Sequence, residues 1–348
     1  MTNSLNQAPF TPFLERVKTG NYIPGDDPIN RLAIAIDGGG MTTIHNVGMA
    51  RVLEDNGIFD VSEMIVGISA GAKLAASVVS GQLTNAEEMF KYSLVNRKFI
   101  NLWRLFSDGR VPVLNLSLLK EMITVENPLD TTKIENSPTE LGIGITDLTN
   151  FQPVVVSSRS IKGDQITDAT MRSVHMPWVA GAPTVKDGVA WGDGGLSWMA
   201  TSHVAKKLGA TKIIELSNNP LSTWEHHKII SGIVSLWIHR YGSAESALKY
   251  RNFVKEQVGF MNCGVVDSDV INIYPDIENR LLPGTLCSKM QFLEQGYKIG
   301  LETAKAALGY ESDVIPTYPE TKRTLIRILG FGKVATANST IFPLISAT

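Results

Sequence analysis

Cysteine is scarce in this chain of 348 residues. The two cysteines, Cys263 and Cys287, lie far apart and offer neither the spacing of a zinc site nor a disulfide framework. We therefore expect a protein that holds no metal, needs no cofactor and resides in a reducing compartment.

The chain also lacks an excess of charge and any long apolar run. Its 32 basic residues face 34 acidic ones, and the net charge of −2 excludes the basic field that nucleic acid binding requires. No stretch reaches the roughly 18 consecutive apolar residues of a membrane-spanning helix. Residues 1–20 have neither the basic start nor the apolar core of a secretory signal. These absences predict a cytoplasmic protein, either soluble or peripheral at a membrane.

What the sequence does contain is a regular alternation of strand and helix patterns. The short apolar segments 32–36 and 63–66 each end in a glycine-rich loop, followed by helix-compatible residues 41–56 and 72–79. Strands are further predicted at 141–147, 153–156, 212–216 and 270–274, and helices within 224–260 and 290–308. This order favours an α/β fold with a layered sheet.

The predicted organisation has three parts. Residues 1–30 are polar and rich in proline, which indicates an extension laid over the core. Residues 31–218 form the core itself. Residues 219–348 form a helical region that we expect to be continuous with the core, because no linker separates the two.

The first candidate site is the loop Gly67-Ile68-Ser69-Ala70-Gly71, which fits the pattern G-x-S-x-G. A serine at a sharp strand-to-helix turn exposes its hydroxyl, and the positive end of the following helix lies beside it. Glycine and serine are common enough that the motif alone is weak. The preceding apolar strand and the following alanine-rich helix make Ser69 a candidate nucleophile.

A second glycine loop, Gly38-Gly39-Gly40, also follows a strand and precedes a helix. Backbone N–H groups in such a loop can converge on an anion. A phosphate-binding loop would need G-x-G-x-x-G or a Gly-Lys-Ser/Thr ending, and this one continues as Met41-Thr42-Thr43. An oxyanion hole serving Ser69 is the better match.

The candidate for the base that would activate Ser69 is a carboxylate. None of the six histidines has a distinctive setting in the sequence. Asp193, in contrast, lies between glycines in Trp191-Gly192-Asp193-Gly194-Gly195, after a predicted hairpin at 184–190. A partly desolvated carboxylate can have its pKa raised far enough to act as a general base.

These three motifs, in this order, resemble the patatin-like phospholipase family across about residues 31–218. The resemblance implies a three-layer α/β/α sandwich with a mainly parallel sheet. It also implies a Ser69–Asp193 dyad, oxyanion donors at Gly38, Gly39 and Gly40, and hydrolysis of lipid acyl esters through an acyl-serine intermediate. The family usually has a cation two places after its third glycine, then a glycine, whereas Thr42 and Thr43 stand here. His175 stands where a small residue is usual before Met176-Pro177.

Two alternatives remain open from the sequence. One is a Ser-His-Asp esterase that uses a later histidine, best His203, as its base. The other is a catalytically silent lipid-binding protein, suggested by the altered residues after the glycine loop.

The basic, partly apolar segment 322–329 permits contact with an anionic membrane. A final helix packed on the core is the favoured interpretation of that segment.

Overall fold

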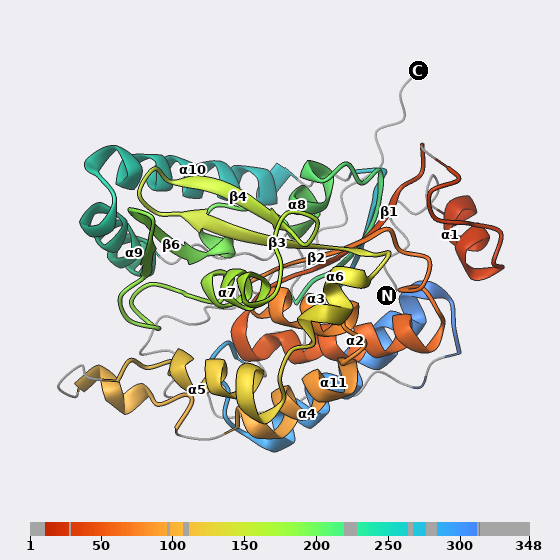
Figure 1. Cartoon of the computed structure of the whole chain (residues 1–348), viewed down its shortest axis with the longest axis horizontal. Helices are drawn as coiled ribbons and strands as arrows, with labels where there is room; N and C mark the ends of the chain where they lie inside the picture. The colour runs from red at the N-terminus through yellow and green to blue at the C-terminus, as the bar shows by residue number, and fades with distance from the viewer. Residues whose placement is uncertain are drawn as a thin grey trace, which may run out of the picture.

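A central sheet flanked by helices on both faces organises the molecule (Figure 1). The computed structural model describes residues 11–311 and 313, apart from 28, 96–97, 107–110, 219–227, 264–266 and 276–283. The predicted segment 322–329 therefore lies outside the described residues.

The elements follow the predicted alternation. The strands are β1 Leu32–Ile36, β2 Met64–Ile68, β3 Glu140–Asp147, β4 Gln152–Ser157, β5 Thr184–Lys186, β6 Val189–Asp193, β7 Lys212–Leu216 and β8 Val270–Ile273. The α-helices are α1 Thr11–Lys18, α2 Ile44–Asp55, α3 Ala70–Val79, α4 Leu83–Glu88, α5 Leu116–Glu121, α6 Thr131–Asn136, α7 Asp164–Ser173, α8 Thr201–Lys207, α9 Lys228–Tyr241, α10 Ala244–Cys263 and α11 Met290–Leu308. Short 3₁₀ segments occupy Gly40–Thr43, Leu102–Phe106 and Gly194–Leu196, and π-helical turns occupy Met89–Ser93 and Met122–Glu126.

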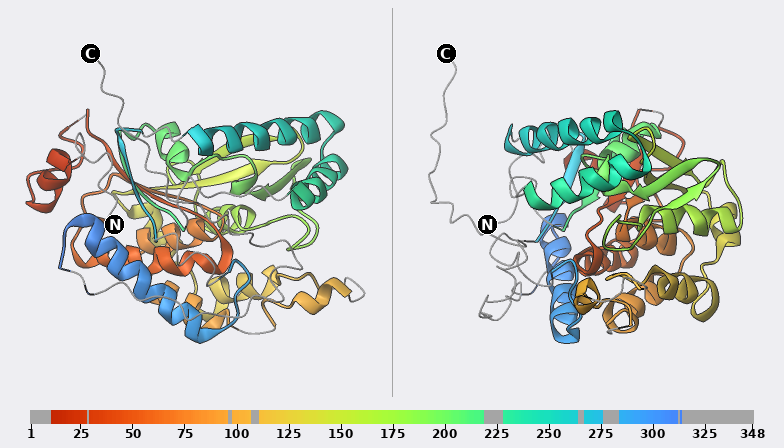
Figure 2. Two further views of the ribbon diagram at one scale, coloured as in Figure 1. Left: turned by 180° about the vertical axis from the view of Figure 1, so that it is seen from behind. Right: turned by 90° about the vertical axis from the view of Figure 1, so that its left-hand side faces the viewer.

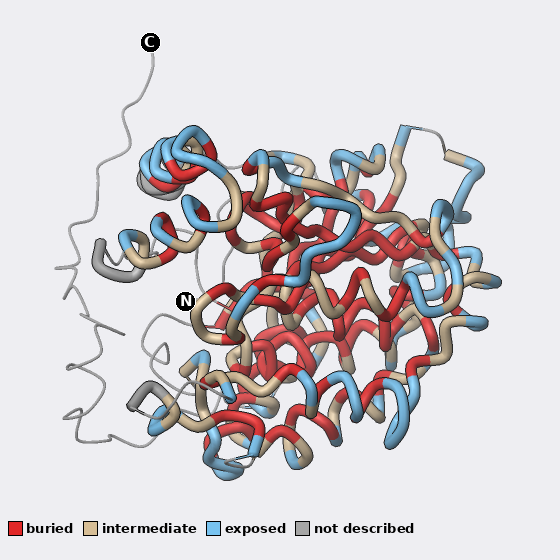
Figure 3. The backbone as a smooth tube through the Cα atoms, turned by 60° about the vertical axis from the view of Figure 1, so that its left-hand side comes forward, coloured by how far each residue is buried: buried red, intermediate tan, exposed pale blue. Residues whose placement is uncertain are grey.

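The sheet has the strand order β5-β6-β3-β2-β1-β7-β8, with β4 paired to β3 outside this path. The strands β3, β2, β1, β7 and β8 are parallel, whereas β4, β5 and β6 pair antiparallel. Every residue of β1 and β2 is buried, as expected for parallel strands covered on both faces. Figure 3 shows the buried backbone gathered in the interior of the molecule. The predicted mixed α/β architecture is therefore confirmed.

Helices cover the sheet in two layers (Figures 1 and 2). The α8 helix packs against β1, β2 and β3 on one face, beside the pair α9–α10. The opposite layer contains α2, α3, α7 and α11. The molecule is thus a three-layer α/β/α sandwich.

The structure adds three local details that the sequence pattern did not specify. Residues 11–18 form an amphipathic helix, because Phe13, Leu14 and Val17 share a side that joins the core. The predicted helix 41–56 begins with a 3₁₀ turn and becomes α-helical only at Ile44. Asp193 is the last residue of strand β6, because its pairing with Ile145 of β3 extends the ladder to that position.

Helices α2 and α11 approach each other closely through two glycines. A Cβ atom on Gly48 of α2 would lie 2.1 Å from the carbonyl oxygen of Tyr297, and one on Gly300 of α11 would lie 2.0 Å from that of His45. These contacts are with backbone atoms, so only a separation of the helices could relieve them.

We predict that Gly48→Ala lowers the free energy of unfolding by about 1–3 kcal/mol, because the added methyl group forces this packing apart. The control is Gly232→Ala in α9, where a Cβ atom meets nothing within 4 Å. That change should stabilise the helix by about 0.5–1 kcal/mol through propensity alone. Urea unfolding measures both, and equal stability of the two variants would contradict the close-packing account.

Candidate active site

Ser69 lies at the sharp turn between β2 and α3. Its backbone has φ 52° and ψ −132°, a conformation that costs a non-glycine residue about 1–3 kcal/mol. A Cβ atom on Gly67 would lie 2.4 Å from the carbonyl oxygen of Gly71, and one on Gly71 would lie 2.2 Å from that of Ile36. Both motif glycines are therefore required by close backbone approach, which holds the strained serine in place.

The ends of two strands meet beside this turn. Ile68, the last residue of β2, pairs with Gly144 of β3, while Asp193, the last residue of β6, pairs with the adjacent Ile145. Since β4 occupies the other edge of β3, β2 and β6 share one edge and meet end to end. The Ser69 hydroxyl donates a hydrogen bond to Asp193 Oδ2 at 2.6 Å.

Asp193 is held from several sides. Its Oδ1 accepts from the Gly195 N–H at 2.8 Å, its N–H donates to the His175 carbonyl at 2.9 Å, and its carbonyl accepts from Thr146 Oγ1 at 2.6 Å. Burial raises the pKa of the Asp193 carboxyl to about 6, while the hydrogen bonds from Ser69 and Gly195 oppose that shift. The carboxylate is thus fixed, desolvated and close to a useful basicity.

Ser173 supports Ser69 and was not identified from the sequence. Its hydroxyl accepts the Ser69 N–H at 2.8 Å and donates to the Gly144 carbonyl at 2.7 Å. It thereby links the serine turn to β3. Ser173 lies at the end of α7, where no local pattern marks it.

The predicted oxyanion loop lies directly against Ser69. A Cβ atom on Gly38 would stand 2.7 Å from Ser69 Cβ, so only glycine fits there. The Gly38 N–H donates to Asp37 Oδ1 at 3.1 Å. The N–H groups of Gly39 and Gly40 hydrogen-bond to no described residue. Within this loop, these two groups remain available to a ligand.

Two further carboxyl groups line the same space, the partly buried Asp37 and the buried Glu215. Burial raises the pKa of Asp37 to about 6, against hydrogen bonds from Thr201 and Gly38. Burial and the neighbouring Asp37 raise the pKa of Glu215, on β7, to about 7. The sequence did not single out Glu215, because it sits within an otherwise apolar strand.

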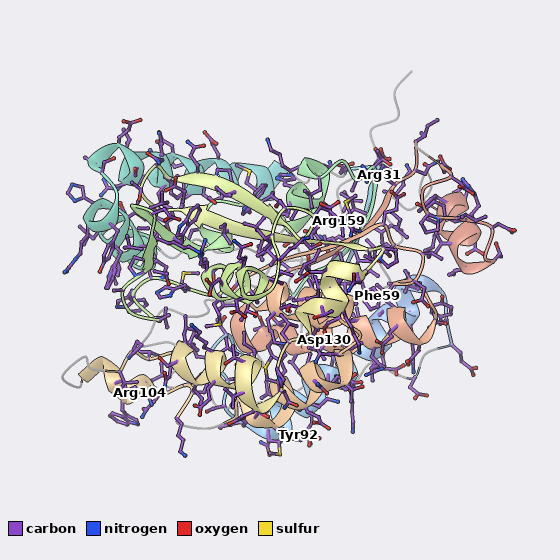
Figure 4. The ribbon with its side chains drawn as sticks, viewed as in Figure 1. Arg31, Phe59, Tyr92, Arg104, Asp130 and Arg159 are labelled. Carbon is purple, nitrogen blue, oxygen red and sulfur yellow. The ribbon has the colours of Figure 1, made fainter. Side chains whose placement is uncertain are left out.

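Ser69, Asp193 and the glycine loop open into one cavity of about 460 Å³. Most of the remaining wall is apolar, and its largest single contribution comes from the segment between residues 89 and 119. It includes Met89, Phe90, Leu94, Phe99, Ile100, Leu114, Leu116 and Leu119. Tyr92 and Arg104 mark the outer side of this segment in the lower layer of Figure 4. The cavity can hold an extended apolar group with one end at Ser69.

The hydrogen bonds to the Asp193 carboxylate come from Ser69 and Gly195, and the histidine side chains described next have other contacts. His203, in α8, has its pKa lowered by burial, with smaller effects from Lys206 and Asp267. The His175 side chain lies 3.5 Å from the Gly181 carbonyl, and His45 Nδ1 lies 2.9 Å from the Thr42 carbonyl. His226 and His227 lie outside the described residues.

Within the described part of the chain, no group of three or more His, Cys, Asp and Glu residues could hold a metal ion. None of the described helices combines the length and apolarity needed to cross a bilayer.

We predict that Asp193 makes the stability of the protein depend on pH. A carboxyl whose pKa rises from 3.8 to about 6 on folding stabilises the fold below about pH 4, and this contribution is lost as pH rises through 6. Relative to Asp193→Asn, the wild type should lose about 3 kcal/mol of unfolding free energy across that range.

Denaturant unfolding between pH 4 and 7 measures this difference. The matched control is Asp187→Asn, the same chemical change at an exposed position of the β5–β6 turn. It should follow the wild type at every pH. A constant offset between wild type and Asp193→Asn would show that the carboxyl is not desolvated.

Part of the chain matches the model of a known protein family. Residues 34–200 match the family model described as patatin-like phospholipase. A search of curated proteins found no match.

Among solved structures, the chain is similar to VipD from Legionella pneumophila, with 13% identity, a TM-score of 0.43, and coverage of 81% of this chain and 67% of that one. It is also similar to the type III effector protein ExoU, with 12% identity, a TM-score of 0.32, and coverage of 81% and 53%. A complex of SpcU with ExoU from Pseudomonas aeruginosa matches at 13% identity and a TM-score of 0.26, covering 68% of this chain and 53% of that one. The chain therefore spans about two thirds of VipD and about half of ExoU. Residues 34–200, the part that contains the glycine loop, Ser69 and Asp193, are thus similar to patatin-like phospholipases.

Proposed function

We propose that this protein is a serine hydrolase of lipid acyl esters that uses Ser69 as nucleophile and Asp193 as base. The observation that carries the proposal is the 2.6 Å hydrogen bond from the Ser69 hydroxyl to Asp193, at one end of a largely apolar cavity. The family of residues 34–200 supports the same reaction class.

The geometry accounts for each step of acyl transfer. Asp193 Oδ2 accepts the Ser69 proton while Ser69 Oγ attacks the ester carbonyl carbon. The carbonyl oxygen becomes an oxyanion, which free N–H groups of the glycine loop would stabilise. Collapse of the intermediate breaks the bond to the alcohol, which leaves with the proton held by Asp193. Water then gives a proton to Asp193 and attacks the acyl-serine, and the carboxylic acid departs as Ser69 recovers its proton.

The loop residues that differ from the family pattern still fit this role. Thr42 Oγ1 donates to the Gly39 carbonyl at 2.7 Å, and Asn218 Nδ2 donates to the Gly38 carbonyl. Both carbonyls are thereby held by side chains of the fold. A cation is not needed to fix the loop, so its replacement by Thr42 is compatible with catalysis.

We predict that Ser69→Ala and Asp193→Asn each lower kcat/KM for an acyl ester by about a thousandfold or more, because both groups act in the same proton transfer. Turnover is measured on phospholipids, lysophospholipids, acylglycerols and short-chain esters. A fluorophosphonate should label wild-type Ser69 covalently.

The controls separate the dyad from the alternatives. Ser160→Ala removes an exposed hydroxyl and should leave turnover and labelling unchanged. His203→Ala should retain most activity. If His203→Ala abolished turnover while Asp193→Asn did not, a histidine would be the base. Failure of the folded wild type to react with the fluorophosphonate would instead support a silent lipid-binding protein.

We further predict that kcat/KM rises with pH through about 6 and then levels, because Asp193 must be ionised to accept the Ser69 proton and its pKa is raised to about 6. A pH profile with a neutral, non-titrating ester tests this. A rate that stays constant from pH 4.5 to 7.5, or one that falls through pH 6, would contradict Asp193 as the base.

A further inference from the structure

Lys73 is a buried cation in the wall of the active-site cavity. It lies on α3, one helical turn after Ser69, and only 6% of its surface is exposed. The lining of the same cavity includes apolar side chains such as Met89, Phe90 and Leu119. An ammonium group in such surroundings is costly unless a partner compensates it.

Within the described residues, the charge of the Lys73 ammonium is only partly compensated. Lys73 Nζ donates to the Ser77 hydroxyl and forms no ion pair with any described carboxylate. An ammonium has three donors, and one neutral hydroxyl satisfies a single one. Burial alone lowers the pKa of Lys73 to about 8, so the group stays largely cationic at neutral pH.

Lys73 is directed away from the reacting atoms. Ser77 lies two helical turns beyond Ser69, about 12 Å along the axis of α3. The pKa of Asp193 is set by burial and by Ser69 and Gly195, with no contribution from Lys73. The ammonium therefore stands well beyond the ester, beside the part of the cavity suited to an acyl chain.

The far side of Lys73 is of mixed character. A small void of about 10 Å³, with room for a single water, lies there. Its lining combines Lys73 with the hydrogen-bonding residues Ser77, Gln82, Asn85, Ser93 and Asn127, the carboxylate Glu126, and the apolar residues Met89, Met122, Ile123 and Leu129. Lys73 thus stands where the apolar cavity wall meets hydrogen-bonding side chains. An acyl chain with an apolar middle and an anionic end would complement the apolar wall and Lys73 in that order.

We propose that Lys73 binds a carboxylate carried at the far end of the acyl chain, so that the enzyme prefers half esters of medium-length dicarboxylic acids over esters of unsubstituted fatty acids. This inference rests on the proposed function, because it places the ester at Ser69. A phosphate of the alcohol portion offers similar anionic chemistry, but it would lie on the leaving-group side and not along the apolar wall.

The test compares p-nitrophenyl octanoate with mono-p-nitrophenyl suberate, which has the same chain length and one terminal carboxylate. The Lys73→Met variant should lower the suberate-to-octanoate ratio of kcat/KM by about tenfold or more, the loss expected for one charge-assisted hydrogen bond. The matched control is Lys120→Met, the same charge change at an exposed site on α5, which should leave the ratio at the wild-type value. A succinate half ester is too short to reach Lys73 and should show no dependence on it.

Binding to Ser69→Ala separates this inference from the proposed function. Calorimetry with monomethyl suberate and methyl octanoate should show a preference for the suberate that Lys73→Met removes in the same background. Such a preference supports the carboxylate site even if the wild type hydrolyses neither ester, a result that would contradict the proposed function alone. Equal ratios in wild type and folded Lys73→Met, in turnover and in binding, would overturn the inference. So would a Lys73 effect confined to substrates with an anionic head group.

Discussion

The site depends on one constraint of the sheet, the meeting of β2 and β6 on the same edge of β3. Ile68 pairs with Gly144 and Asp193 pairs with Ile145, and these two residues of β3 are adjacent. Adjacent residues of a strand lie only about 3.3 Å apart, so Ser69, which follows Ile68, is held close to Asp193. Gly194 completes this approach, because a Cβ atom there would lie 2.3 Å from the Gly144 carbonyl. Two residues 124 positions apart in sequence are thus joined through the backbone of a single strand.

Burial raises the pKa of Asp193, which lies where β2 and β6 meet. Asp193 is 1% exposed, and desolvation brings its pKa toward that of a physiological base, while the Ser69 hydroxyl partly offsets the effect. Asp37 and Glu215 also have raised pKa values but serve other bonds: Asp37 accepts from Thr201, and Glu215 accepts from the Ser202 N–H. Among these three carboxyl groups, only Asp193 receives a hydrogen bond from Ser69. Burial is thus the largest cause of all three raised pKa values, but the consequences differ.

The sequence predicted the features that depend on local pattern. Uniformly apolar runs located β1 and β2, and the glycines around Ser69 marked a turn that backbone contacts now explain. Ser173 and Glu215 were missed because their roles arise from tertiary contacts, across 104 residues to Ser69 and across the sheet to α8. Thr42 was recognised as a departure from the family pattern, but its bond to the Gly39 carbonyl depends on loop geometry that the residue types do not specify.

The cavity wall is another feature that the sequence pattern could not predict. The segment from Met89 to Leu119 contains a π-helical turn, a 3₁₀ turn and a short helix, and no single periodic pattern identifies its inward side chains. Lys73, in contrast, lies on α3 at a position fixed by the serine turn itself. The rigid helix sets how far its ammonium lies from Ser69, whereas the irregular wall sets the width of the space between them. Ser69 and Lys73 therefore share one scaffold, and under the proposed function the length of α3 between them would set the preferred length of the substrate.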